Sequence, residues 1–172
     1  MEAIRAGIIG TEVSSNSNSA HFLFEKSNFG EKIEDKINYL PVEALYLLEE
    51  KKIEIFFKNK KLTKSELLSR FQKSDKKIST KYLVFKDLRT KGYIVKTALK
   101  FGAEFRVYDK GKKPGKEHAK WLVITDRESN KAYWHEFSSK NRVAHSTKKN
   151  LLLALVDEEG EIIYYEVKWI KP

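Results

Sequence analysis

Apolar and polar positions along the first half of the chain predict short strands and helices separated by polar turns. Pro41–Leu48 is mostly apolar and places a proline in the first turn of a helix, where its missing N–H has no cost. Ile53–Phe57 is a compact apolar run and predicts a strand. Ser14–Ser19 consists only of serine and asparagine, which predicts a loop between strand-like N-terminal pieces.

A second helix start is visible at Thr63–Glu66. This segment is a capping box, in which the threonine hydroxyl and the glutamate carboxylate bind free backbone N–H groups. The helix that follows is expected to bury Leu67, Leu68 and Phe71. The polar stretch Ser74–Lys77 then interrupts the pattern, so we place a domain boundary there, with domains at 1–77 and 78–172.

The second half predicts a helix over Thr80–Lys91 that ends at Gly92. Ser138–Lys149 favours one or two helical turns, and 109–117 is a loop. The expected strands are Tyr93–Thr97, Glu104–Tyr108, Trp121–Thr125, Ala132–Phe137, Leu151–Val156 and Glu161–Ile170. Since strands and helices mix without strict alternation, the predicted fold class is α+β (mixed α/β). A small N-terminal α/β domain precedes a C-terminal domain with a mixed sheet flanked by helices.

The composition directs attention to the second half. The formal net charge is +10, but residues 1–77 carry only 14 basic and 12 acidic residues, whereas 78–172 carry 20 and 12. Such a basic excess suits an anionic partner such as nucleic acid, although lysine-rich surfaces also occur in proteins that bind none.

Several function classes are excluded by what the sequence lacks. The absence of cysteine removes disulfides, thiol nucleophiles and Cys-ligated metal sites. No P-loop, dinucleotide-binding or Gly-x-Ser-x-Gly motif occurs. Without an apolar run of about 18 residues or a signal pattern, we expect a soluble cytoplasmic protein. No cofactor and no metal are expected.

His118 is the histidine in the most exposed context, at the end of a lysine-, glycine- and proline-rich loop. A histidine, with an ordinary pKa near 6.5, can donate a proton at neutral pH. Tyr108 ends a strand at the other side of the loop, and Lys148 and Lys149 precede an apolar strand. Taken singly, each has a plain structural explanation: a loop histidine, a packed tyrosine and solvated lysines.

Taken together, three segments resemble the archaeal tRNA-splicing endonuclease family. Order, residue type and spacing agree, with ten residues from Tyr108 to His118 and thirty-one from His118 to Lys149. The segments are Tyr82–Lys96, Phe101–Tyr108 with Glu117-His118 after the loop, and Arg142–Lys149 running into the apolar strand. The resemblance covers nearly all of the second half and, more weakly, Pro41–Leu48. It implies a nuclease-like C-terminal domain.

The resemblance implies a metal-independent cleavage of RNA. Tyr108 would be the general base on the 2′-hydroxyl and His118 the general acid on the leaving 5′-oxygen. Lys149 would stabilise the phosphorane, with Lys148 as the rival for this role. The expected products are a 2′,3′-cyclic phosphate and a 5′-hydroxyl. Because an ordinary tyrosine has a pKa of about 10, either neighbouring cations favour the phenolate or Tyr108 only orients the nucleophile.

The same resemblance implies how the substrate is held. Arg142 and Trp169 match the pair that sandwiches a flipped base in this family, by cation–π and stacking contacts. Trp169 could equally pack in a strand face with Ile163, Tyr165 and Val167. The family's substrate is a bulge-helix-bulge element in precursor tRNA.

Self-association is also expected. Glu161–Ile170 has apolar residues on both faces, which suits a strand buried against a partner. Asp157, Glu158 and Glu159 are either a solvated turn or, as in the family, an acidic loop that inserts into an opposing subunit. A chain with both the triad and the acidic loop suits a homotetramer better than a heterotetramer with a structural subunit.

Two other functions remain open. One is a non-catalytic RNA-binding or structural subunit, which would bind precursor tRNA but release no intron. The other is a DNA endonuclease, which would need clustered carboxylates for metal. Glu104, Asp109 and Glu117 are present, but without the spacing of metal ligands.

Overall fold

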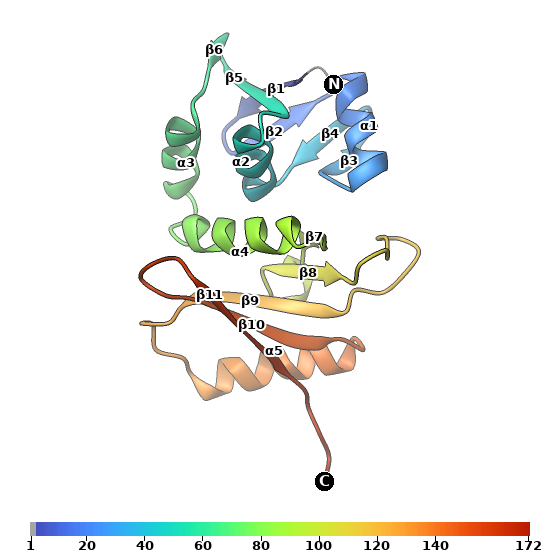
Figure 1. The fold of residues 1–172 in the computed structure, drawn as a ribbon, viewed down its shortest axis with the longest axis vertical. Helices are drawn as coiled ribbons and strands as arrows, with labels where there is room; N and C mark the ends of the chain where they lie inside the picture. Colours follow the sequence, from blue (N-terminus) through green and yellow to red (C-terminus); the bar gives the residue numbers. More distant parts are fainter. Residues whose placement is uncertain (1–2) are drawn as a thin grey trace. The chain divides into compact units, whose positions relative to one another are not determined.

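The computed structural model describes residues 3–172 and divides into two compact units, up to Tyr82 and from Leu83 to Pro172 (Figure 1). The division falls inside helix α4 (Ile78–Thr90). The domain boundary after Lys77 stays a prediction. Both units combine helices with a sheet that contains parallel and antiparallel pairs, which confirms the predicted α+β class.

The first unit is built on a six-stranded sheet in the order β3-β4-β2-β1-β5-β6. Only β1 and β5 pair in parallel. Helix α1 (Asn18–Ser27) joins β2 to β3, α2 (Pro41–Glu49) joins β4 to β5, and α3 (Lys64–Gln72) follows β6. The strands are β1 (Ile4–Ile9), β2 (Glu12–Ser15), β3 (Glu31–Ile33), β4 (Lys36–Tyr39), β5 (Ile53–Phe57) and β6 (Lys60–Lys61).

The predicted elements at Pro41–Leu48, Thr63–Glu66 and Ile53–Phe57 are confirmed as α2, the start of α3, and β5. The Thr63 hydroxyl accepts from the backbone N–H of Glu66 at 3.2 Å, and the Glu66 carboxylate accepts from that of Thr63 at 2.9 Å. Leu67 and Phe71 are buried as expected, while Leu68 is half-buried.

The loop predicted at Ser14–Ser19 was wrong. Its first residues end β2, and Asn18 begins α1. Ser17 is the N-cap of that helix, because its hydroxyl accepts from the backbone N–H of Ala20 at 3.3 Å. Serine and asparagine are frequent at helix starts as well as in loops, since their short side chains bind nearby backbone groups.

Glu43 is a charged residue inside the first unit, with only 1% of its surface exposed. One carboxylate oxygen accepts from the backbone N–H of Gly30, and the other from that of Leu40, both at 3.0 Å. The carboxylate therefore satisfies two backbone donors, one at the start of its own helix and one in the segment before β3.

The second unit contains a five-stranded sheet in the order β11-β10-β9-β8-β7. Strands β9 and β10 are parallel and are joined by helix α5 (Trp134–Ser146), whereas the other neighbours are antiparallel. A short helix, η1 (Leu99–Phe101), connects β7 to β8. The strands are β7 (Ile94–Thr97), β8 (Phe105–Tyr108), β9 (Trp121–Arg127), β10 (Asn150–Val156) and β11 (Ile162–Val167).

The two faces of β8 have different roles. Phe105 contacts Phe85 of α4, with ring centroids 5.9 Å apart, so this face packs into the core on that side. Arg106 pairs across the sheet with Leu122 of β9, which packs with Ala144 of α5 on the opposite face. Because side chains alternate along a strand, Tyr108 shares that face with Arg106.

Two predictions for the second unit were wrong. The strand expected at Ala132–Phe137 is instead the entry to α5, a single helix that continues to Ser146. A parallel pair of strands needs a crossover connection, and this helix provides it. The last strand ends at Val167, so Trp169 lies outside it. The other predicted strands and the helix before Gly92 are confirmed to within a few residues.

No helix among residues 3–172 has the length and apolar character that crossing a bilayer would require.

The buried carboxylate of Glu43 generates a stability prediction. Glu43→Ala removes the acceptor of two backbone N–H groups, one buried and one partly buried, and is expected to lower the free energy of unfolding by about 2–4 kcal/mol. Glu50→Ala, which removes an exposed ion pair to Lys52 at 3.8 Å, is the control and should cost less than about 1 kcal/mol. Urea denaturation measures both, and equal losses would contradict the assigned role.

Candidate active site

Three neighbouring strands of the second sheet, β8, β9 and β10, have ends that lie side by side. Since β8 runs antiparallel to β9, its last residue, Tyr108, lies beside the start of β9. Since β10 runs parallel to β9, the start of β10 lies there too. His118 precedes β9 and Lys149 precedes β10. Strand direction alone therefore gathers three residues that are far apart in the sequence.

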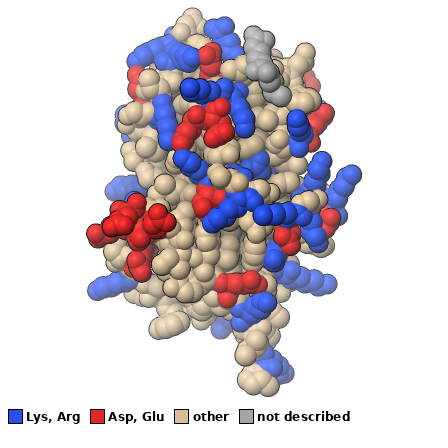
Figure 2. All heavy atoms as spheres, in the orientation of Figure 1, with Lys and Arg blue, Asp and Glu red and all other residues tan. Residues whose placement is uncertain are grey.

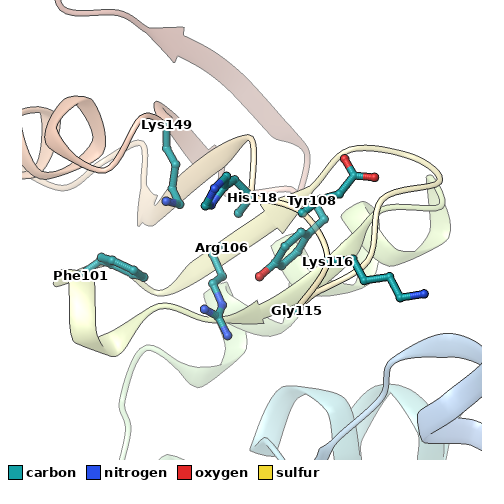
Figure 3. Close-up of a pocket in the computed structure, with 9 residues that line it drawn as sticks. Phe101, Arg106, Tyr108, Gly115, Lys116, His118 and Lys149 are labelled. Atoms are coloured by element: carbon teal, nitrogen blue, oxygen red, sulfur yellow. The ribbon is translucent and has the colours of Figure 1, made fainter.

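A cavity of about 320 Å³ opens at these strand ends (Figure 3). It contains all three residues for which the sequence predicted catalytic roles. The lining residues are Phe101, Arg106, Tyr108, Gly115, Lys116, Glu117, His118, Ala119 and Lys149. In Figure 3 the Lys149 ammonium and the His118 ring lie side by side, and the Tyr108 hydroxyl points toward the Arg106 side chain.

The three residues differ in exposure. Tyr108 is only 4% exposed, whereas His118 is exposed at the end of the loop. A buried tyrosine with its hydroxyl in a cavity is held in one orientation, and an exposed histidine can exchange protons with water. The arrangement can therefore support proton transfer at two points around a bound group.

The loop 109–117 is basic, and Figure 2 shows lysine side chains gathered over it. Its carboxylates are engaged: Glu117 pairs with Lys112 at 2.9 Å, and Asp109 pairs with Lys120 at 3.6 Å. Glu104, the third carboxylate considered for a metal-dependent nuclease, accepts from the backbone N–H of Thr125 at 3.2 Å. These carboxylates serve the protein's own cations and backbone.

The end of α5 determines which lysine enters the cavity. The backbone N–H of Lys149 donates to Ala144 at 2.8 Å and that of Lys148 to His145 at 3.0 Å, which together form a Schellman motif. Lys148 takes the left-handed conformation at φ 56° that this motif requires. Lys148 is exposed and does not line the cavity, whereas Lys149 does.

The Lys149 ammonium has two partners in this structure. It donates to the carbonyl of Thr147 at 2.8 Å and lies 5.3 Å from the ring centroid of Phe101. Partial burial lowers its pKa from the ordinary value of 10.5, and the positive charge of Arg106 lowers it further. The charge is thus held in a site that disfavours it, as expected where an anion is to be bound.

Trp169 is half-exposed, and its ring lies against His145, with centroids 4.5 Å apart. Arg142 is exposed three residues before His145 on α5, so the two share a helix face. Packing of Trp169 with Ile163 and Tyr165 in one strand was wrong, because the tryptophan lies beyond β11.

The acidic residues Asp157, Glu158 and Glu159 form the turn between β10 and β11. Glu158 and Glu159 are exposed, and Figure 2 shows acidic side chains clustered over this turn. β11 is an edge strand of the sheet, with Ile163 and Tyr165 exposed on it.

Three residues at the site were not predicted from the sequence. Arg106 and Phe101 line the cavity, and His145 contacts Trp169. Arg106 could have been noticed in the sequence, because it is a charged residue within a mostly apolar strand. It also lies on the same face of that strand as Tyr108. Phe101 and His145 could not have been noticed in this way, since their contacts depend on distant segments.

Comparison with known families gives two matches. Residues 78–164 match the family model described as tRNA intron endonuclease, catalytic C-terminal domain. Residues 5–68 match the model described as tRNA intron endonuclease, N-terminal domain.

Similar proteins named tRNA-splicing endonuclease occur in several archaea. The protein of Thermococcus gammatolerans is 40% identical over 158 residues, which is 92% of each chain. That of Methanothermobacter thermautotrophicus is 40% identical over 153 residues, 89% of each chain. That of Nanoarchaeum equitans is 44% identical over 151 residues, 84% of this chain and 97% of its own.

The strained residue at the end of α5 generates a second prediction. Lys148→Gly removes the steric cost of a side chain at positive φ and is expected to raise the free energy of unfolding by about 1 kcal/mol. Ser146→Gly, inside the last helical turn, is the control and should lower it by about 1 kcal/mol. Urea denaturation compares the two, and a loss of stability in Lys148→Gly would refute the assigned geometry.

Proposed function

The chain belongs to the tRNA intron endonuclease family, and we propose that it cuts precursor tRNA at exon–intron junctions within bulge-helix-bulge elements. The observation that carries the proposal is the meeting of Tyr108, His118 and Lys149 in one cavity. An exposed, basic loop beside that cavity gives a polyanion access to it.

The proposed reaction is a transesterification within the RNA strand. Tyr108, as its phenolate, accepts the proton of the 2′-hydroxyl, whose oxygen attacks the adjacent phosphorus. The bond from phosphorus to the 5′-oxygen breaks, and protonated His118 gives that oxygen its proton. The products are a 2′,3′-cyclic phosphate and a 5′-hydroxyl. Because the nucleophile belongs to the substrate, proton transfer and charge stabilisation are sufficient for the reaction, with no metal.

Lys149 is proposed to stabilise the phosphorane, whose oxygens carry more negative charge than those of the starting phosphate. Its ammonium has to exchange the Thr147 carbonyl for a phosphate oxygen when RNA binds. A flexible lysine can make this change with little movement of the backbone. The Schellman motif holds that backbone in place at the helix end.

Arg142 and Trp169 are proposed to hold a base flipped out of a bulge. Trp169 has half of its surface free for stacking, and Arg142 is exposed on the helix face beside it. Stacking of unpaired bases on aromatic rings and on guanidinium groups is a common mode of RNA recognition.

We further propose that the protein is a homotetramer. The exposed apolar residues of edge strand β11 suit pairing with a second copy. The acidic turn Asp157–Glu159 suits insertion into a basic surface of another pair, since the chain carries an excess of positive charge.

Cleavage of a bulge-helix-bulge RNA in EDTA tests the proposed reaction. The wild-type chain is expected to release fragments with 2′,3′-cyclic phosphate and 5′-hydroxyl ends, identified by mass spectrometry. His118→Ala should lower the single-turnover rate by about 10²–10⁴-fold, because the leaving oxygen loses its proton donor. His21→Ala, in the first unit, is the control and should cleave at the wild-type rate.

Full activity in His118→Ala would remove the residue from the mechanism. RNA binding without cleavage by the wild-type chain alone, with cleavage restored by a second subunit, would favour the non-catalytic alternative.

Light scattering tests the proposed assembly. Replacing Asp157, Glu158 and Glu159 by their amides is expected to convert a tetramer into a dimer, since the turn loses the charge that holds two pairs together. The control replaces Glu31, Glu34 and Asp35, which are exposed in the first unit, and changes the net charge equally. A wild-type monomer, or a tetramer in both variants, would contradict the proposal.

A further inference from the structure

The cavity contains a second cation with no role in the proposed reaction. Arg106 lines it together with Tyr108, His118 and Lys149. The Nε of Arg106 is buried and has no hydrogen-bond partner in residues 3–172. A charged donor removed from water without a partner is unfavourable, so the position of this group in the cavity calls for an explanation.

Two other arginines of the second unit, Arg127 and Arg89, differ in this respect. Arg127 donates from its Nη1 to the carbonyl of Asp157 at 3.2 Å. Arg89 donates to that of Tyr93 at 3.3 Å. Both guanidinium groups are used to hold a turn or a helix end, whereas Arg106 forms no ion pair within the described residues and faces the cavity instead.

We propose that Arg106 binds the reacting phosphate, donating from its guanidinium to a non-bridging oxygen while Lys149 binds at the other side. This inference rests on the proposed function, because it identifies the group that fills the cavity as a phosphodiester of RNA. Arg106 is thereby a catalytic residue beside the three that the sequence predicted.

The chemistry favours two cations of different shape. A phosphorane intermediate carries two charged equatorial oxygens, and a single ammonium contacts only one of them well. A planar guanidinium presents several donors in a rigid fork and binds a phosphate oxygen with defined direction. In Figure 3 the guanidinium lies near the Tyr108 hydroxyl and the ammonium lies beside His118, so the two cations approach the cavity from different sides.

Electrostatics on the free protein agrees with this geometry. Arg106 and Lys149 repel one another, and this repulsion adds to burial in lowering the pKa of Lys149. The remaining ionisable groups around the cavity are Lys116, Glu117, His118 and Tyr108, and the carboxylate of Glu117 is paired with Lys112. A bound phosphate therefore supplies the negative charge that the cavity lacks.

Variants at Arg106 test the inference in the full chain with bulge-helix-bulge RNA. Arg106→Met is expected to lower kcat/KM by about tenfold to hundredfold, the effect of one charge-assisted hydrogen bond. Arg106→Lys keeps the charge but loses the fork, and should recover only part of the loss. Lys131→Met removes an exposed charge outside the cavity and is the control, with the wild-type value expected.

Two further measurements separate phosphate binding from a structural role. The thermal stability of Arg106→Met should equal or exceed that of the wild type, because an unpartnered buried donor is removed. The pKa of Lys149 should also rise in Arg106→Met, because the repelling charge of Arg106 is removed. The NMR signal of the Lys149 ε-methylene group, followed against pH, measures this change.

A readout without cleavage makes the inference independent of activity. The Nε–H signal of Arg106 in a ¹H–¹⁵N spectrum should shift saturably on addition of inorganic phosphate, and the signal should be absent in Arg106→Met. A shift in a wild-type chain that cuts no RNA would retain the phosphate site and reject the proposed function.

Wild-type cleavage with an unchanged kcat/KM in Arg106→Met would reject the role of Arg106 and retain the function. A fall in stability that accounts for the lost rate would also overturn it.

Discussion

The parallel pairing of β9 and β10 is the constraint on which the site depends. Two parallel neighbours require a crossover, so the chain has to pass through α5 between them. The first residues of β9 and β10 then lie at the same end of the sheet, where the antiparallel strand β8 ends. Tyr108, His118 and Lys149 come from these three strand ends.

Positively charged side chains that the protein does not neutralise lie at the same strand ends. Arg106 and Lys149 face one cavity, and the only carboxylate beside them, Glu117, is paired with Lys112. The buried carboxylate of Glu43, by contrast, accepts hydrogen bonds from two backbone donors. This contrast is typical of functional sites, where local stability is given up for an interaction with a ligand.

Local signals predicted the elements that local chemistry stabilises. The capping box at Thr63 and Glu66, the proline at the start of α2 and the apolar strands were identified because neighbouring residues determine them. The segment Ala132–Phe137 is rich in aromatic residues, which favour strands when considered alone. Its helical state depends on the crossover, and a short segment carries no information about that.

The sequence by itself determined the family, the fold class and the proposed roles of Tyr108 and His118, because motif spacing and residue type survive without coordinates. It left Lys148 as a rival of Lys149 for the third role. Tertiary structure decided which of Lys148 and Lys149 enters the cavity, since the left-handed turn at the end of α5 directs only one of them there. It also brought Arg106 and Trp169 to their neighbours. Contacts of this kind depend on strand direction and register, which are properties of the whole sheet rather than of any segment.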